Sequence, residues 1–211
     1  MKTSTRLYVL TCLLFCICIA GNGQTIPRSE QDIPLFPGSV RNLEAQKQTL
    51  ADYKEIHAGE AISDLQISVY SAGSVADQVC RFYIEKLGAK EGFPEDNDYL
   101  PNQEINTKPW YEVSYFPNSW FEDQYEGNIK IHDGKWFKSA LSERNQWKQG
   151  KWLQGAYFEW TGILNSGDLV RCSVEIIDDD SFDSRTRTVT NKTLITILSR
   201  IERSDEDMED D

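Results

Sequence analysis

The sequence predicts an α+β fold: an antiparallel or mixed sheet of about six strands, covered by one or two helices. Apolar and polar residues alternate at 65–70 and again at 170–176, as half-buried strands require. Residues 75–87 have the apolar spacing of an amphipathic helix. The turn sequence Asn-Ser-Gly-Asp at 165–168 is typical of a hairpin between two strands.

The first 23 residues have the layout of a secretory signal peptide. Lys2 and Arg6 precede an apolar run at 7–20, and small residues follow at 21–23. A retained membrane anchor is the alternative, but these 14 residues are fewer than the roughly 20 that span a bilayer. We therefore expect cleavage of residues 1–23, no transmembrane anchor in the mature chain, and a periplasmic or secreted protein.

The chain is strongly acidic. It has 34 Asp and Glu residues against 22 Lys and Arg, a formal net charge of -12. Because this charge repels phosphate backbones, we expect no nucleic acid partner. Residues 204–211 hold six acidic and no basic residues, which predicts a disordered acidic tail. Residues 24–203 contain no repeat or second boundary, and are expected to form a single α+β domain.

The N-terminal half begins with an arm at 25–40, where three prolines and Gly38 oppose a helix. A strand at 65–70 follows. Ser74 and Asp77 then have the spacing at which side chains cap a helix start, and Gly88 stands where a left-handed cap ends the helix. The expected buried face of this helix consists of Ala76, Val79, Cys80, Tyr83 and Leu87.

The second half begins after a polar, proline-containing connection at 89–109. Strands are expected at 110–116 and 127–132, separated by an aromatic, acidic turn. A helical stripe follows, formed by Trp136, Phe137, Ala140, Leu141, Arg144 and Trp147. Three further strands are predicted at 153–164, 170–176 and 195–201.

Two cysteines, Cys80 and Cys172, remain after signal cleavage. In an oxidising compartment they could form a disulfide, and the alternative is a pair of buried thiols, since both positions face the predicted core. The only histidines are His57 and His132, and the chain has no CxxC or HExxH motif. We therefore expect no metal site and no cofactor.

All six tryptophans lie between residues 110 and 160. They form either the core of the C-terminal half or an aromatic surface for a protein, peptide or glycan. Trp120 and Phe121 lie among polar residues in a turn-like context, and are therefore the preferred binding residues.

Carboxylates offer two further candidates. Four aspartates at 178–183 could hold calcium, or could form a solvated connection beside Arg185 and Arg187. Glu159 and Glu175 could act as acid and base, or could simply occupy the outer face of the sheet. The chain contains no nucleophile elbow, P-loop or dinucleotide glycine pattern.

Part of the N-terminal half resembles known proteins. The sequence Pro-Leu-Phe-Pro-Gly at 34–38, the strand at 65–70, and Phe82-Tyr83 followed by Leu87-Gly88 are similar to a module of uncharacterised exported bacterial proteins. This resemblance covers roughly residues 33–93. The helix also resembles that of glyoxalase and bleomycin-resistance proteins, the vicinal oxygen chelate family, whose metal ligands lie on paired modules. Only one copy of the pattern is present here, so we expect no such metal-dependent activity.

The sequence thus predicts an exported, non-enzymatic module that binds a protein, peptide or glycan through an aromatic surface. The alternatives are a structural or envelope-assembly protein, and an enzyme that uses loop carboxylates.

Overall fold

A computed structural model describes most of the chain, namely residues 26–58, 63–92, 108–148, 150–164 and 168–202. The predicted signal peptide (1–23) and acidic tail (204–211) lie outside these residues, as do most of the polar connection and the hairpin turn after residue 164.

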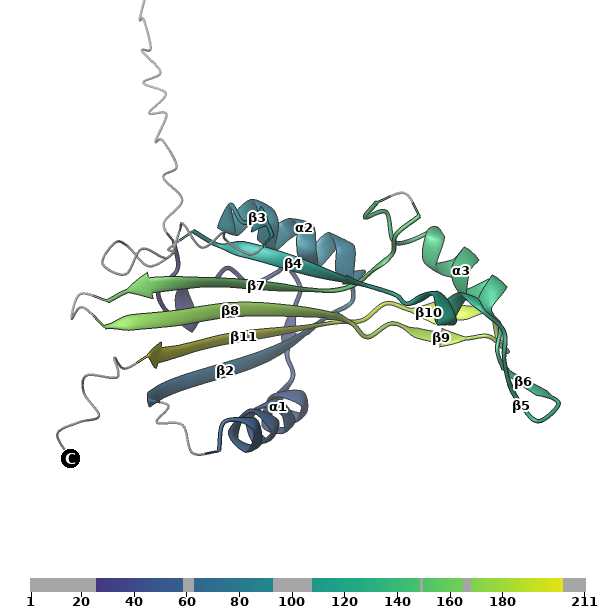
Figure 1. Cartoon of the computed structure of the whole chain (residues 1–211), viewed down its shortest axis with the longest axis horizontal. Coiled ribbons are helices and arrows are strands. Elements are labelled where there is room, and N and C mark those ends of the chain that lie inside the picture. Colours follow the sequence, from purple (N-terminus) through teal and green to yellow (C-terminus); the bar gives the residue numbers. More distant parts are fainter. Residues whose placement is uncertain (1–25, 59–62, 93–107, 149, 165–167, 203–211) are drawn as a thin grey trace, which may run out of the picture.

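The main sheet has seven strands in the order β1-β2-β11-β8-β7-β4-β3 (Figure 1). Neighbouring strands are antiparallel, except for β3 and β4, which are parallel. The predicted α+β class with a mixed sheet is therefore confirmed. The strands are β1 (Val40–Arg41), β2 (Ser63–Ala72), β3 (Lys90–Glu91), β4 (Trp110–Tyr115), β7 (Leu153–Ile163), β8 (Leu169–Asp178) and β11 (Thr193–Glu202).

Helix α2 (Ala76–Leu87) covers one face of this sheet and closes the main core. All five residues predicted for its apolar face are buried. This core contains side chains from five strands, because successive residues of a strand point to opposite faces and one face of each strand turns inward. The sheet contributes Ala72, Tyr111, Leu153, Ala156, Phe158, Trp160, Val170, Cys172, Val174, Ile176, Ile195 and Ile197.

Both ends of α2 lie within one residue of the prediction, but the side-chain cap predicted for its start is absent. Gly88 caps the helix in the left-handed conformation, with φ of 62°. At the other end, Val75 is the N-cap and no side chain caps the helix, so the predicted Ser74 cap is wrong. The Ser74 carbonyl instead accepts a hydrogen bond from Thr193 Oγ1 at 2.6 Å, and Asp77 Oδ2 accepts one from the Gln146 amide at 3.1 Å. Tertiary contacts therefore hold the helix start in place.

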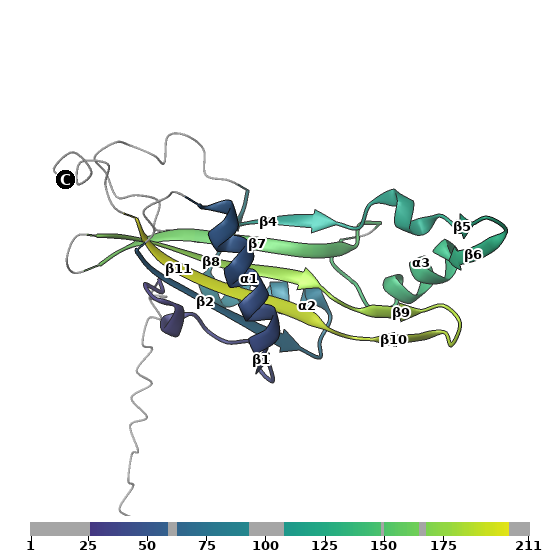
Figure 2. The ribbon, with the colours of Figure 1, turned by 90° about the horizontal axis from the view of Figure 1, so that it is seen from below.

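Helix α1 (Leu43–Ile56), which the sequence analysis did not identify, lies on the opposite face of the sheet and crosses its strands (Figures 1 and 2). Asn42 caps it, because its Oδ1 accepts a hydrogen bond from the Ala45 amide at 3.0 Å. None of its residues is buried. A hydrogen bond from Arg200 Nη1 to Tyr53 Oη at 2.7 Å ties it to β11.

A second region, which we call the hairpin lobe, extends beyond the ends of β4 and β8 (Figure 2). Around a small aromatic core it combines η3 (Asn118–Phe121), β5 (Gln124–Glu126), β6 (Ile129–His132), α3 (Gly134–Ser142), β9 (Ser181–Asp183) and β10 (Thr188–Thr190). A further short helix, η1 (Glu30–Asp32), lies in the N-terminal arm.

Two predictions for this region need correction. The strand predicted at 127–132 does not join the main sheet, because β6 pairs with β5, which lies inside the segment predicted as a turn. The helical stripe predicted through Trp147 ends at Ser142. The physical reason lies in Asn145, whose Nδ2 donates to the Leu153 carbonyl at 2.8 Å and turns the chain toward β7.

Candidate functional site

The two residues predicted to bind a partner differ in their exposure to solvent. Both belong to η3. Trp120 is 40% exposed, whereas Phe121 is half-buried and packs against the rings of Phe137 and Trp152, at centroid distances of 5.8 and 4.6 Å. Trp120 therefore offers surface to a partner, while Phe121 mainly supports the core of the hairpin lobe.

The β5–β6 hairpin carries the most exposed apolar side chains of this lobe. Ile129 is 70% exposed, Ile131 55% and Tyr125 57%. Ile129 lies opposite Glu126, and Ile131 lies where the β5–β6 register shifts, between Lys130 and His132. Tyr125 lies opposite Lys130, whose ammonium is 5.9 Å from the ring centroid. The sequence pattern indicated a strand here, but it did not indicate that the apolar residues of this strand would stay uncovered.

The base of the hairpin is joined to η3 and the segment after it by hydrogen bonds and close backbone packing. His132 Nε2 forms a 2.7 Å hydrogen bond with the Trp120 carbonyl, and the Gly134 amide donates to Asp123 Oδ1 at 3.0 Å. A Cβ atom on Gly134 would lie 2.4 Å from the Phe121 carbonyl carbon, so only glycine permits this approach. The exposed side chains are thus held by close backbone packing.

Cys80 and Cys172 both lie in the main core, as the sequence predicts, and neither is exposed to solvent. Both are free thiols, so the structure contains no disulfide between them. Burial raises the pKa of each thiol to about 12. Because the thiolate is the reactive form, neither cysteine is suited to act as a nucleophile.

The aspartates at the end of β8 face cations and backbone amides of the same region. Asp180 pairs with Arg144 at 2.9 Å, and Asp179 pairs with Lys192 at 2.6 Å. Asp178 accepts a hydrogen bond from the Asp180 amide, yet burial, followed by the charge of Asp180, raises its pKa to about 7. These contacts form a local network that joins the end of β8 to the segment after α3 and to the residue before β11.

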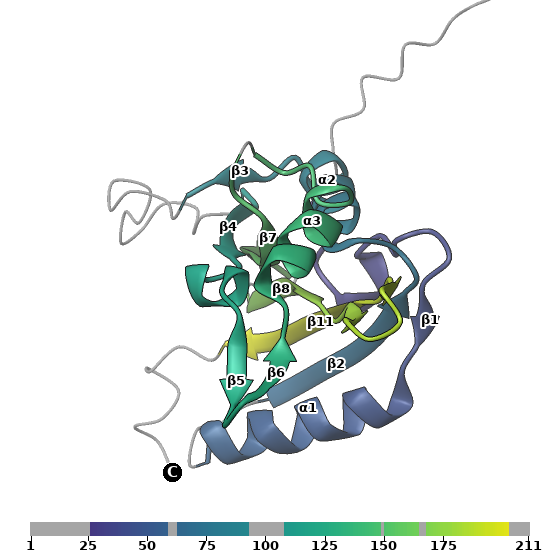
Figure 3. The same ribbon diagram turned by 90° about the vertical axis from the view of Figure 1, so that its right-hand side faces the viewer.

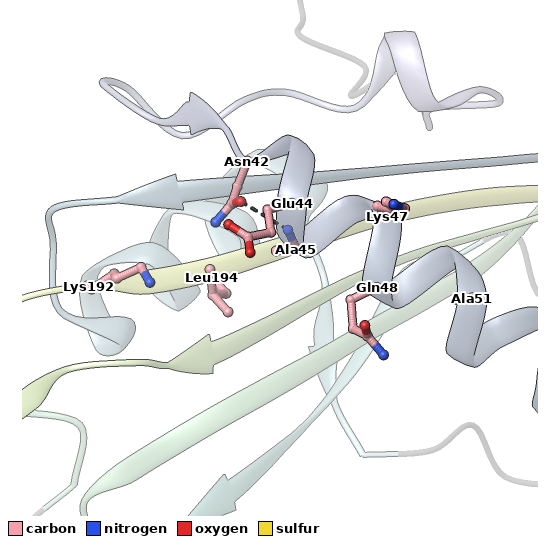
Figure 4. A pocket seen from close by; sticks show the side chains of 8 residues that line it. All are labelled: Asn42, Glu44, Ala45, Lys47, Gln48, Ala51, Lys192 and Leu194. Carbon is pink, nitrogen blue, oxygen red and sulfur yellow. Dashed lines mark hydrogen bonds between the residues drawn. The ribbon is translucent and has the colours of Figure 1, made fainter.

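The face of the main sheet that carries α1 contains two hollows. One has a volume of about 520 Å³ and lies between α1 and the start of β11, where Glu44 is next to Leu194 (Figure 4). The other has a volume of about 360 Å³ and lies over β4, β7 and β8. The register places Leu194 opposite Ile177, and Ile177 opposite Gly155, so both hollows open on one face.

One of the two glutamates considered as an acid–base pair, Glu175, lines the second hollow. Glu159 is not among its lining residues and lies nearby on β7, opposite Ser173 of β8. Both do occupy an outer face of the sheet, as one of the two interpretations expected. Glu159 accepts a hydrogen bond from Tyr157 Oη at 2.6 Å, and Arg171 lies 3.8 Å from it. No local sequence pattern pointed to Tyr157 or Glu112, because they come from different strands and only the sheet pairing makes them neighbours.

Comparison with known proteins found no matching family model, no matching curated protein and no matching solved structure. Within the described part of the chain, every helix is too short or too polar to cross a bilayer.

Proposed function

We propose that the protein is an exported binding module that captures a partner protein on its β5–β6 hairpin. The observation that carries this proposal is the exposure of Ile129 and Ile131, at 70% and 55%, on a hairpin outside the main sheet. Exposed aliphatic side chains on an ordered element are a common feature of protein interfaces. Export is supported by the signal-like sequence at 1–23.

The shape of the lobe suits presentation of this surface. Figures 1 and 3 show the hairpin extending away from the plane of the main sheet, on the side that carries α1. Its base is fixed by the aromatic core, in which Phe116 and Phe137 are buried. A hairpin that is ordered before binding loses little conformational entropy when the partner arrives.

The chemistry of the hairpin favours a protein over a glycan. Ile129 and Ile131 offer no hydrogen-bonding groups, which sugar hydroxyls would need. Within the described residues, β5 and β6 form a sheet of only two strands, so an extended segment can add to an outer edge. Exposed Glu126 lies directly opposite Ile129, and Glu122, just before β5, is also exposed, so a partner with a basic group beside an apolar centre fits best.

Replacement of both isoleucines by serine tests the proposal. Capture of a partner from envelope extracts by the wild-type protein should be lost in the Ile129→Ser, Ile131→Ser variant. The Val40→Ser variant is the matched control, because Val40 is a 69% exposed aliphatic residue on an edge strand of the main sheet. All three proteins should melt at similar temperatures, since exposed side chains contribute little to stability.

The same preparation permits a second readout. Binding of the captured partner should reduce acrylamide quenching of Trp120, measured as the difference between wild type and a Trp120→Phe variant. If every captured protein binds the double serine variant as well as wild type, the hairpin is not the interface.

A further inference from the structure

A separate feature lies on the α1 face of the main sheet, in the hollow of about 360 Å³ over β4, β7 and β8. It is independent of the hairpin surface, because no residue of the hairpin lines it. The hollow combines carboxylates, an aromatic ring, uncharged polar side chains and aliphatic residues. Its lining side chains include Glu112, Ser114, Gln154, Tyr157, Glu175 and Ile177.

The sheet register places an aromatic ring between two carboxylates. Tyr157 on β7 lies directly opposite Glu112 on β4, and directly opposite Glu175 on β8. Residues that face each other across neighbouring strands have Cβ atoms about 4.5–5.5 Å apart. The two glutamates therefore border the Tyr157 ring on both sides.

The hydroxyl of Tyr157 is already used within the protein. It donates a hydrogen bond to Glu159 Oε2 at 2.6 Å. The ring of Trp110 contacts the Tyr157 ring edge-on, at a centroid distance of 6.0 Å. These two contacts fix the orientation of the Tyr157 side chain, which is still 37% exposed. What it offers to a ligand is mainly the aromatic ring.

The two glutamates that border the ring do not have the hydrogen bond and the nearby cation that Glu159 has. Glu159 has both the Tyr157 hydroxyl and the Arg171 guanidinium nearby. Among the described residues, no hydrogen bond or ion pair is found for the side chain of Glu112 or Glu175. Although Glu175 reaches solvent, its surroundings reduce hydration enough to raise its pKa. A positive charge placed between these carboxylates would offset that loss of hydration.

We propose that this hollow binds an organic ammonium group, seated against the Tyr157 ring between Glu112 and Glu175. An aromatic face attracts an alkylammonium through its quadrupole, and the two carboxylates supply ion pairs. A metal ion would gain little from the ring, because a ring face has no lone pair to coordinate it in the way carboxylate oxygens do. An anionic ligand would be repelled.

Calorimetric titration of the full mature chain with choline chloride tests the proposal, with sodium chloride at the same concentration as the ionic-strength reference. We expect saturable binding that weakens at least tenfold in Glu175→Gln and in Tyr157→Ala. Tyr157→Phe keeps the ring and should retain most of the affinity. Glu126→Gln removes an exposed carboxylate in the hairpin lobe and should bind as wild type does.

Circular dichroism melting of each variant ensures that only folded proteins are compared, and Glu112→Gln provides a second carboxylate variant. Absence of saturable choline binding would overturn the proposal. Equal weakening in Glu126→Gln and Glu175→Gln would also overturn it, since the effect would then reflect net charge alone. The double serine variant of the hairpin should still bind choline, so failure of one proposal is distinguishable from failure of the other.

Discussion

The two faces of the main sheet are built from the same strands and yet have opposite character. On the α2 face, Val174 and Ile195 are fully buried. On the α1 face, Glu175 and Tyr157, each adjacent in sequence to a buried residue, reach solvent. Helix α2 buries half of its residues, whereas α1 buries none.

This difference follows from the alternation of side chains along each strand. Since successive side chains point to opposite faces, one face can form the core while the other keeps polar and aromatic groups accessible. Substitutions on the two faces should therefore have different consequences, even at neighbouring positions.

The largest contrast should come from two positions on β7. Trp160 is 1% exposed and its Nε1 donates to the Pro27 carbonyl at 2.7 Å, so Trp160→Ala should lower the free energy of unfolding by about 3–5 kcal/mol. Tyr157→Ala, on the open face, should cost about 1 kcal/mol or less. Urea denaturation measures both. Similar losses would mean that the α1 face is a second core.

A smaller effect should follow from a methyl group added to the open face. A Cβ at Gly155 would lie 2.6 Å from the Ile176 carbonyl oxygen, a backbone atom that cannot move without disturbing the β7–β8 pairing. We expect Gly155→Ala to destabilise the protein by about 1–3 kcal/mol. Gly73→Ala is the control, because no atom lies within 4 Å of its Cβ position. An unchanged urea midpoint for Gly155→Ala would contradict this strand geometry.

The α2 face also contains a carboxyl group at its end, Asp178, which lies opposite Thr193. Its pKa of about 7 in the folded protein exceeds the usual 3.8. Ionisation therefore favours the unfolded chain, and this group lowers stability as the pH rises from about 4 to about 7. Asp178→Asn keeps an oxygen for the Asp180 amide and removes this penalty.

The gain from Asp178→Asn should be near zero at pH 4 and on the order of 1 kcal/mol above pH 7, because one pKa unit corresponds to about 1.4 kcal/mol and the partly exposed carboxyl keeps some hydration. Urea titrations at pH 4.5, 6 and 8 measure it. A gain that is independent of pH would show that Asp178 titrates normally.

The smallest contrast concerns the two helix starts. Asn42→Ala removes the cap of α1 and should cost about 1 kcal/mol. Ser74→Ala should change the free energy of unfolding by a few tenths of a kcal/mol at most, because the Ser74 side chain does not cap α2. If Ser74→Ala lowered the free energy of unfolding as much as Asn42→Ala does, the Ser74 side chain would be a helix cap after all.

The sequence by itself determined the α+β class, most of the long strands, and the buried face and C-terminal end of α2. These features follow from local patterns, since a period of two, a period near 3.6 and a glycine at a helix end are visible within a few residues. Helix α1 was not predicted, because polar and charged residues fill most of its turns and it has no buried face.

Only the tertiary structure decided which groups meet. Glu112, Tyr157 and Glu175 come from three strands, and only the pairing register makes them neighbours. In the same way, the residues around Ile129 and Ile131 indicated a strand. Whether another layer would cover this strand depended on its pairing, and β6 pairs with β5 outside the main sheet. Local patterns report how a segment buries one side of itself, whereas the surface left open depends on contacts between distant segments.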